Sequence, residues 1–289
     1  MSKQHAQERA AALEADVPYL LDFGSGDTVY QGDCRLNMTR SFSIVIPAYN
    51  ESARLGASLD RVLTFISRQP WEAEVIVVND GSQDRTAEIV RSYAQRSQAV
   101  RLLENPRNRG KGYSVRNGVL NANGDFILFT DADLSAPIEE APKLLDALAA
   151  GADIAIGSRW VRAELQTRRQ SIARQVLGRV FNGLLRVLLR LDFKDTQCGF
   201  KAFRREAARA VLPLQQIEGW GFDPEILFLA KRMRLRVQEV PVIWAHDDRT
   251  RINPLADGSR MVADMLRIRC YSLAGKYGEL RALSAPEHS

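Results

Sequence analysis

The chain has 289 residues, of which 45% are hydrophobic and 26% are charged, and its formal net charge is +5. This composition predicts a sizeable core in one large domain or two small ones. A charge this modest implies only that anionic partners are not repelled, and we expect no nucleic-acid partner.

Three cysteines, Cys34, Cys198 and Cys270, are widely spaced and odd in number. They argue against a disulfide framework and for a reducing compartment, and no Cys/His cluster suggests zinc. The polar opening MSKQHAQERAAALEAD predicts no signal peptide. No run of about 18 apolar residues occurs, so we expect no membrane-spanning helix.

Residues 1–40 show no clear periodicity apart from a short helical start, and the pattern changes at Phe42. Short, continuous apolar segments then alternate with helical ones, which is typical of a parallel sheet with helices on both faces. The predicted elements here are a strand in SFSIVIP, a helix over 51–68, a strand over 74–80, a helix over 84–96, a strand over 100–104, a further helix, and strands over 125–130 and 152–158.

Beyond Trp160 the order of elements changes. Residues 168–191 form a long helical pattern that contains six arginines. The elements predicted after it are a strand over 199–203, helices near 206–212 and 224–234, a strand over 237–245 and a helix from about Ala256.

Polar residues follow three of the predicted strands, at 47–51, 79–82 and 131–133. Ligands bind at the carboxyl ends of the strands in such sheets. Asp131 and Asp133 alternate along an extended segment, so both carboxylates point the same way and repel each other. A hard divalent cation, Mg²⁺ or Mn²⁺, relieves that repulsion and leaves positions for substrate phosphates. The alternative is a helix N-cap before Pro137, for which one acid would suffice.

Two common nucleotide-binding motifs are absent from the sequence. IPAYNESARLG lacks the glycines of a dinucleotide fold, and NPRNRGKGY has Asn105 and Gly112 where a P-loop needs Gly and Ser/Thr. Asp80, in NDGSQD, is either a turn residue or an acceptor of hydrogen bonds from a base or sugar. The residues alone leave that choice open.

The motifs IPAYNE, VNDGSQDRT, NRGKGYSVRNG and FTDADLS, in this order and spacing, resemble the family 2 inverting glycosyltransferases with the GT-A fold. The resemblance covers roughly residues 42–275. DTQCGFKAFRREAA, GWGFDPEIL and DGSRM further resemble the dolichyl-phosphate β-glucosyltransferase branch, close kin of the dolichyl-phosphate mannosyltransferases. Those enzymes move one sugar from UDP-glucose or GDP-mannose to a polyprenyl phosphate.

The resemblance implies an α/β GT-A fold, Rossmann-like, with a mostly parallel sheet flanked by helices and a C-terminal acceptor-side region. It divides the chain into an N-terminal extension over 1–40, a nucleotide-sugar-binding half over 41–160, an acceptor-binding half of the same domain over 161–275, and a tail over 276–289.

The resemblance also implies roles for individual residues. The nucleotide-sugar-binding residues would be Pro47, Ala48, Tyr49, Glu51, Asp80, Gly110, Lys111, Asp131, Ala132 and Asp133. The metal ligands would be Asp131 and Asp133. The catalytic residues would be Asp133, Asp223 and Arg260, and the acceptor phosphate would be bound by Arg159, Arg168, Arg169, Arg174, Ser259 and Arg260. Two departures are Ser135, where kin often have Gln, and Arg260, where kin often have Lys.

The chemistry of the acceptor determines whether a base is needed. A sugar hydroxyl must lose a proton to a carboxylate, whereas a phosphate monoester, with a second pKa of about 6, is mostly dianionic already. Abundant arginines and only three histidines suit a phosphate nucleophile. Asp223 lies where hydroxyl-accepting relatives place their base, but it is equally explained as the N-cap of a helix that begins at Pro224.

The helical pattern over 168–191 combines apolar residues with its arginines. A basic amphipathic helix of this kind lies on an anionic membrane surface, and the alternative is a core-packed helix with a solvated basic face. Because a polyprenyl acceptor must be reached at a membrane, we predict a cytoplasmic protein that attaches peripherally to the membrane's cytoplasmic face.

The sequence therefore predicts metal-dependent, inverting transfer of a hexose to a polyprenyl phosphate, dolichyl or undecaprenyl, with glucose from UDP-glucose as the first choice. The alternatives are a GDP-mannose-dependent mannosyltransferase and a transferase that acts on a hydroxyl-bearing lipid. A non-catalytic nucleotide-sugar-binding protein is disfavoured because the Asp131–Asp133 pair is intact.

Overall fold

A computed structural model describes residues 41–161, 183, 185–245 and 254–278 of the chain. Contacts divide the chain into two units, Met1–Arg35 and Leu36–Ser289, and every described residue belongs to the second. The predicted N-terminal extension and nearly all of the predicted tail lie outside the described residues, and the division of the GT-A domain into two halves stays a prediction.

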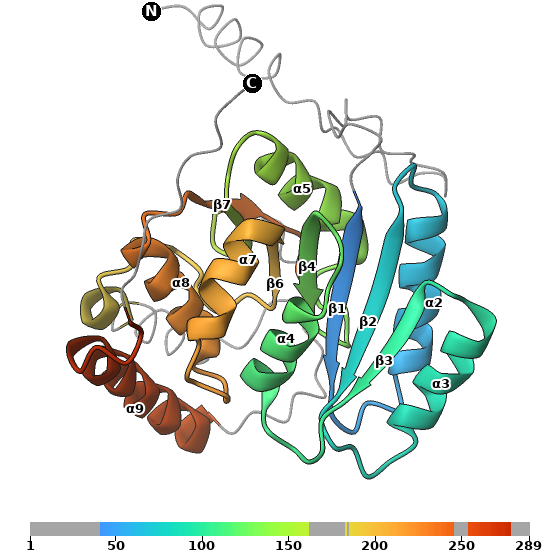
Figure 1. Ribbon diagram of the computed structural model, residues 1–289, viewed down its shortest axis with the longest axis horizontal. Helices are drawn as coiled ribbons and strands as arrows, with labels where there is room; N and C mark the ends of the chain where they lie inside the picture. Colours follow the sequence, from blue (N-terminus) through green and yellow to red (C-terminus); the bar gives the residue numbers. More distant parts are fainter. Residues whose placement is uncertain (1–40, 162–182, 184, 246–253, 279–289) are drawn as a thin grey trace, which may run out of the picture. The chain divides into compact units, whose positions relative to one another are not determined.

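The described part is built on one mixed sheet (Figure 1), whose strand order is β3-β2-β1-β4-β6-β5-β7. Neighbouring strands run parallel except at β6, which is antiparallel to both β4 and β5. The strands are β1 (Phe42–Ala48), β2 (Ala73–Asn79), β3 (Val100–Glu104), β4 (Phe126–Thr130), β5 (Ile154–Ser158), β6 (Phe200–Arg204) and β7 (Val237–Pro241).

Helices cover both faces of this sheet. In Figure 1, α4, α7 and α8 lie on one face, and they share a buried cluster with β4 and β5. The opposite face is covered by α2 and α5, which meet at a short 3-10 helix, η1. The described helices are α2 (Leu55–Ser67), α3 (Thr86–Arg96), α4 (Lys111–Leu120), η1 (Ile138–Glu140), α5 (Ala141–Ala149), α7 (Arg205–Val211), η3 (Leu212–Leu214), α8 (Phe222–Arg232) and α9 (Pro254–Leu273).

The continuous apolar strands are those buried on both faces. All five residues of β4 and all five of β5 are buried, as expected for central strands between two helical layers. The mostly parallel α/β fold predicted from the sequence is therefore confirmed. GFKAF is a strand as expected, but as β6 it enters between β4 and β5 in the opposite direction.

Several predicted boundaries were wrong by a few residues. The helix expected at 224–234 begins at Phe222, and the strand expected at 237–245 ends at Pro241. Of the helix predicted over 168–191, only the last part is described, with helical residues at 183 and 185–189. Among the residues that the structure describes, no helix is both long and apolar enough to cross a bilayer.

Candidate active site

Asp131 and Asp133 follow β4 directly, at the carboxyl end of the central parallel strands. Their side chains remain 26% and 18% exposed, so a ligand can reach both. Lys111, the first residue of α4, places its ammonium 2.5 Å from Asp131 Oδ1. Arg54 lies 3.8 Å from Asp133 Oδ2. The two carboxylates and two cations come from the segments after β4 and β1 and from the start of α4, and they meet at one edge of the sheet.

The electrostatics of this group follow from burial and close charges. Burial raises the pKa of Asp133, and the neighbouring Asp131 carboxylate raises it further. Burial opposes the charged form of Lys111, but Asp131 and Asp223 outweigh it and raise the Lys111 pKa above its usual range. The two carboxylates therefore repel each other, as the Asp-x-Asp pattern predicted, and Lys111 and Arg54 balance their charge.

The helix-cap alternative for the acidic pair is wrong. Asp133 Oδ1 accepts a hydrogen bond from the Ser135 amide at 2.9 Å, which closes a turn in which Leu134 has a φ of 48°. The next element, η1, receives no side-chain cap and follows Pro137. Asp131 takes no part in that turn through its side chain, because its carboxylate faces Lys111.

The residues present fit a hard divalent cation. Asp131 and Asp133 offer carboxylate oxygens, and Mg²⁺ is typically bound by one or two carboxylates together with substrate phosphates. Within the described ranges, no group of three or more His, Cys, Asp or Glu side chains gathers at one point. Ser135 is 7% exposed and supplies its amide to Asp133, so the described part of the site offers two carboxylates rather than a full protein cage.

The segment after β1 forms the wall where the nucleotide is expected. Pro47 and Ala48 end the strand, and Tyr49 projects with 39% of its surface exposed. Asn50 adopts a φ of 54°, and its side-chain oxygen accepts from the Gln83 amide at 2.8 Å. The segment that carries Tyr49 and Glu51 is therefore fixed to the loop after β2.

A second anchor of the same segment is Asp84. Its carboxylate accepts from the Ser52 amide at 3.1 Å and from the Thr86 amide at 3.0 Å. Although burial would raise it, the hydrogen bonds from Thr86 and Ser52 lower the Asp84 pKa to about 2. Asp84 thus ties Thr86, the first residue of α3, to the segment after β1, although the residue in the N-cap position is Arg85.

Asp80 is only 3% exposed and holds the loop that delivers Lys111. Its carboxylate accepts from Asn105 Nδ2 at 2.7 Å, from the Arg109 amide at 3.0 Å and from the Gly110 amide at 2.8 Å. Gly110 has a φ of 104°, a conformation that favours glycine. Asp80 therefore organises the NRGKG loop, and its contact with a base stays a prediction.

Sequence reasoning missed two residues near the acidic group: Gly199, in the turn before β6, and Lys201, within β6. A Cβ on Gly199 would lie 2.1 Å from Asp131 Oδ2, so only glycine leaves room for that carboxylate. Lys201 is fully buried and donates to the Cys198 carbonyl at 2.6 Å and to Asp223 Oδ1 at 2.6 Å. A lysine inside an otherwise apolar strand was the available signal, because such a residue is almost never buried unless paired.

Asp223 does not cap the helix, contrary to one of its two predicted roles. The helix α8 begins at Phe222, which places Asp223 in the first turn, with its carboxylate on Lys201. Burial raises the Asp223 pKa, and the charges of Lys201 and Lys111 oppose that rise. The structure thus brings Asp223 into one electrostatic group with Asp131 and Lys111.

Arg159 directly follows β5, and its guanidinium is directed at a fully buried carboxylate. Its Nε and Nη2 donate to Asp195 at 2.7 and 2.8 Å. Burial would raise the Asp195 pKa, but Arg159 outweighs it and holds that pKa below its usual range. Backbone amides of Lys194 and Asp195 in turn donate to Glu239 of β7. Binding of an acceptor phosphate by Arg159 stays a prediction.

The other predicted acceptor residues are described only in part. Arg168, Arg169 and Arg174, and the side chain of Ser259, lie outside the described residues. Arg260 is exposed on α9, next to Met261, whose sulfur accepts from Gln197 Nε2 at 3.7 Å. The first half of α9 is thereby linked to the loop that contains Asp195.

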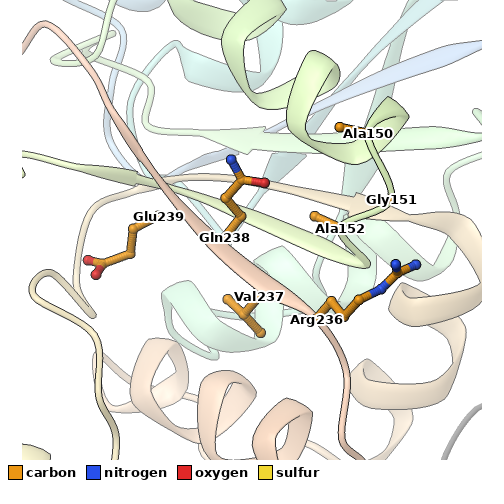
Figure 2. Close-up of a pocket in the computed structure, with 7 residues that line it drawn as sticks. All are labelled: Ala150, Gly151, Ala152, Arg236, Val237, Gln238 and Glu239. Carbon is orange, nitrogen blue, oxygen red and sulfur yellow. The ribbon is translucent and has the colours of Figure 1, made fainter.

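A hollow of about 460 Å³ lies elsewhere, at the amino ends of β5 and β7 (Figure 2). It is bordered by the Ala150–Ala152 segment and by Arg236 and Glu239. Because ligands of such sheets bind at the carboxyl ends of the strands, this hollow is not part of the candidate site.

Comparison with known proteins identifies the family. The sequence model of glycosyl transferase family 2 matches residues 43–212. Among curated proteins, dolichyl-phosphate beta-glucosyltransferases of Trichomonas vaginalis and Dictyostelium discoideum are 38% and 36% identical over 245 and 246 residues. These matches cover 81% of this chain in both cases, and 72% and 75% of those proteins.

Solved structures show the same fold. Glucosyl-3-phosphoglycerate synthase from Mycobacterium tuberculosis, crystallised with Mn²⁺, UDP-glucose and phosphoglyceric acid, superposes with a TM-score of 0.61 at 21% identity. The match covers 79% of each chain. The same enzyme with Mn²⁺, UDP and its product gives a TM-score of 0.61 at 22% identity. Given the family model and the curated relatives, this chain belongs to glycosyl transferase family 2 and is a glycosyltransferase.

Proposed function

We propose that this glycosyltransferase moves a hexose, glucose from UDP-glucose in the first instance, to a polyprenyl phosphate with inversion of configuration. The acceptor phosphate oxygen attacks C1 of the sugar, and the bond from C1 to the diphosphate oxygen breaks on the opposite side. UDP leaves with the bonding electron pair, and the product is a polyprenyl-phosphate hexose. No proton has to be removed from a dianionic phosphate for this step.

The donor half of this proposal rests on the convergence of Asp131, Asp133 and Lys111. The two carboxylates would hold Mg²⁺ or Mn²⁺, which when bound stabilises the negative charge of the departing diphosphate by several kcal/mol. The Lys111 ammonium, already 2.5 Å from Asp131, is within reach of the same phosphates. Asp80 keeps Lys111 there by holding the loop before it. The relatives' names support glucose as the sugar.

The acceptor half rests on Asp223, the single observation that distinguishes a phosphate from a hydroxyl. A general base for a hydroxyl needs a carboxylate that is free to take a proton. Asp223 is 3% exposed, and its Oδ1 is 2.6 Å from the Lys201 ammonium, a partner that opposes protonation. Burial raises the Asp223 pKa, but the same burial and the pairing with Lys201 keep an acceptor hydroxyl away from this carboxylate. An acceptor phosphate does not require a base.

We also propose that the chain works as a peripheral protein on the cytoplasmic face of a membrane, because its acceptor is a lipid. Support comes from the basic composition of residues 168–191. The described end of that segment is divided between core and solvent: Leu185 and Leu189 are buried, whereas Val187 is 77% exposed. Partial core packing therefore accompanies any membrane contact of this segment.

A transfer assay with the full chain tests the proposal. Labelled UDP-glucose, GDP-mannose and UDP-galactose are each supplied with Mn²⁺ or Mg²⁺ and with dolichyl phosphate, undecaprenyl phosphate or the alcohol dolichol. We expect labelled lipid from UDP-glucose and a polyprenyl phosphate, none from dolichol, and none with EDTA. Product from GDP-mannose alone would show that the donor is GDP-mannose rather than UDP-glucose. Product from dolichol would refute the phosphate acceptor.

Asp223→Asn separates the two acceptor classes further. We expect it to slow transfer to a polyprenyl phosphate less than Asp133→Asn does, because Asp223 is not asked to take a proton. Loss of activity below detection in Asp223→Asn, with a folded protein and unchanged donor binding, would favour a hydroxyl acceptor instead.

Liposome flotation tests the membrane part. Binding to vesicles with anionic lipid should weaken when Arg179, Arg186 and Arg190 are changed to Gln, because the arginines would lose their attraction to the headgroups. Unchanged flotation would count against this segment as the attachment site.

A further inference from the structure

Trp220 leaves a large apolar surface in water beside the candidate site. It is 44% exposed, whereas Trp71 is 9% exposed and Trp160 and Trp244 are partly buried. Large aromatic side chains are normally covered on folding, and an exposed one beside a polar site marks a contact surface. Neither the metal site nor the acceptor phosphate site requires an indole.

The backbone that carries Trp220 is held on both sides. A Cβ on Gly110 would lie 2.6 Å from the Glu218 carbonyl oxygen, so the loop before α4 touches the chain two residues before the tryptophan. A Cβ on Gly221 would lie 2.6 Å from Asp264 Cβ, so α9 touches the residue after it. The backbone at Trp220 is therefore held between these two elements.

The indole also lies beside the group that reaches the metal site. The Lys111 ammonium is 5.1 Å from the centre of the Trp220 ring, and the same ammonium is 2.5 Å from Asp131 Oδ1. Asp223 follows three residues later in the first turn of α8. The ring therefore borders the expected diphosphate site, and the chain after it leads directly into α8, which belongs to the predicted acceptor-binding half.

The unit that must occupy such a space in any transfer is the sugar being moved. It is attached to the diphosphate at one end and attacked from the other, so it lies between donor and acceptor. A hexopyranose carries its hydroxyls around the rim and C–H groups on its faces, and such a face is a good partner for an aromatic ring. Tyr49, which is also exposed, follows β1 on the side where the nucleotide is expected.

We infer that Trp220 is the apolar platform against which one face of the transferred hexose packs, an inference that rests on the proposed donor function. The ring hydroxyls of glucose are all equatorial, and in UDP-glucose only the diphosphate at C1 is axial, so the face opposite the diphosphate is relatively apolar. Galactose has an axial hydroxyl at C4 that disturbs that free face. Trp220 therefore contributes to the choice of sugar as well as to donor affinity.

Calorimetric titration of the full chain with UDP-glucose and with UDP, each with Mn²⁺, tests this. Trp220→Leu should weaken UDP-glucose binding about fivefold to tenfold, the range of a single aromatic contact, and leave UDP binding unchanged. Trp220→Phe should retain most of the affinity. Leu120→Ala is the control, because Leu120 has a similar exposure of 39% but lies at the opposite end of α4.

Equal weakening of UDP and UDP-glucose, or of neither, would overturn the inference. If the wild-type chain binds GDP-mannose rather than UDP-glucose, the proposed donor is wrong, but the comparison of GDP-mannose with GDP still decides the role of Trp220. As a second measurement, the kcat/KM preference for UDP-glucose over UDP-galactose should narrow in Trp220→Leu. A preference equal to that of the wild type would refute the role in sugar choice.

Discussion

The buried ion pair between Lys201 of β6 and Asp223 of α8 can be tested by Lys201→Met. Met retains most of the lysine stem, so the substitution mainly removes the ammonium. Lys201 is fully buried and Asp223 is 3% exposed, and the two are 2.6 Å apart. The variant therefore leaves a buried carboxylate without its ion-pair partner.

The size of the effect follows from that burial. Breaking a buried pair by removing one partner costs about 3–5 kcal/mol. For a domain of this size, 1 kcal/mol shifts the melting temperature by roughly 2–4 °C, so the loss is on the order of 10 °C. Thermal unfolding of the full chain, followed by circular dichroism, measures it. Lys231→Met is the matched control, on the helix α8 that also carries Asp223, because the pair of Lys231 with Asp192 is exposed and contributes little to stability.

The pH dependence supplies an independent signature. Burial already raises the folded-state pKa of Asp223, and Lys201 opposes that rise. In Lys201→Met the folded pKa rises further above the unfolded value, so the folded state binds the proton more tightly. Stability of the variant is then lost as the pH rises from the unfolded pKa through the folded one. The difference in stability between Lys201→Met and the wild type should therefore become smaller as the pH is lowered toward about 4.

A double variant decides whether the unpaired charge is the cause. Replacing both partners, as in Lys201→Met with Asp223→Leu, removes the buried charge altogether and should restore most of the lost stability. The reasoning is refuted if Lys201→Met is as stable as Lys231→Met, or if its deficit is the same at pH 4 and pH 8.

Three other substitutions follow from the same structure. Asp133→Asn should lower transfer by about 100-fold or more, because it removes one of two expected metal ligands; full activity of this variant in EDTA would contradict the metal site. Gly199→Ala places a Cβ 2.1 Å from Asp131 Oδ2 and forces that carboxylate to move by roughly 1 Å, which should cost about 100-fold in kcat/KM with little change in melting temperature. An active Gly199→Ala enzyme would show that the position of Asp131 is not critical. Tyr277→Phe removes a 2.7 Å hydrogen bond to the buried Glu225 and should lower the free energy of unfolding, measured with urea, by about 1.5–3 kcal/mol. An unchanged urea midpoint would show that the two backbone amides that also donate to Glu225 are sufficient to stabilise it.

Local sequence patterns were sufficient to predict the strands and the acidic pair Asp131 and Asp133. Continuous apolar segments such as FILFT can be buried only between two helical layers, so their order along the chain predicts a mostly parallel sheet. In such a sheet the residues that follow each strand collect at one edge, which is why Asp80, Asp131 and Asp133 were expected at the same edge of the sheet. The alternation of Asp131 and Asp133 likewise predicts two carboxylates that point the same way.

The partners of those residues were not accessible from local patterns. That Asp80 holds the loop before Lys111 depends on hydrogen bonds to residues 25–30 positions away. The helix boundary near Asp223 was misplaced because Pro224 suits the first turn whether it is the first helical residue or the third. The pairing of Arg159 with Asp195 likewise joins residues 36 positions apart.

The sequence by itself determined the layered sheet and the acidic edge at which β1, β2 and β4 end. Both follow from hydrophobic periodicity and from the succession of strands and helices along the chain, which short stretches of sequence reveal. What only the tertiary structure decided is the surroundings of that edge. Because β6 enters antiparallel between β4 and β5, it brings Gly199 beside Asp131 and Lys201 beside Asp223. Pairing between strands some 70 residues apart is selected by the energy of the whole core and by burial of charge, which no local window of sequence contains.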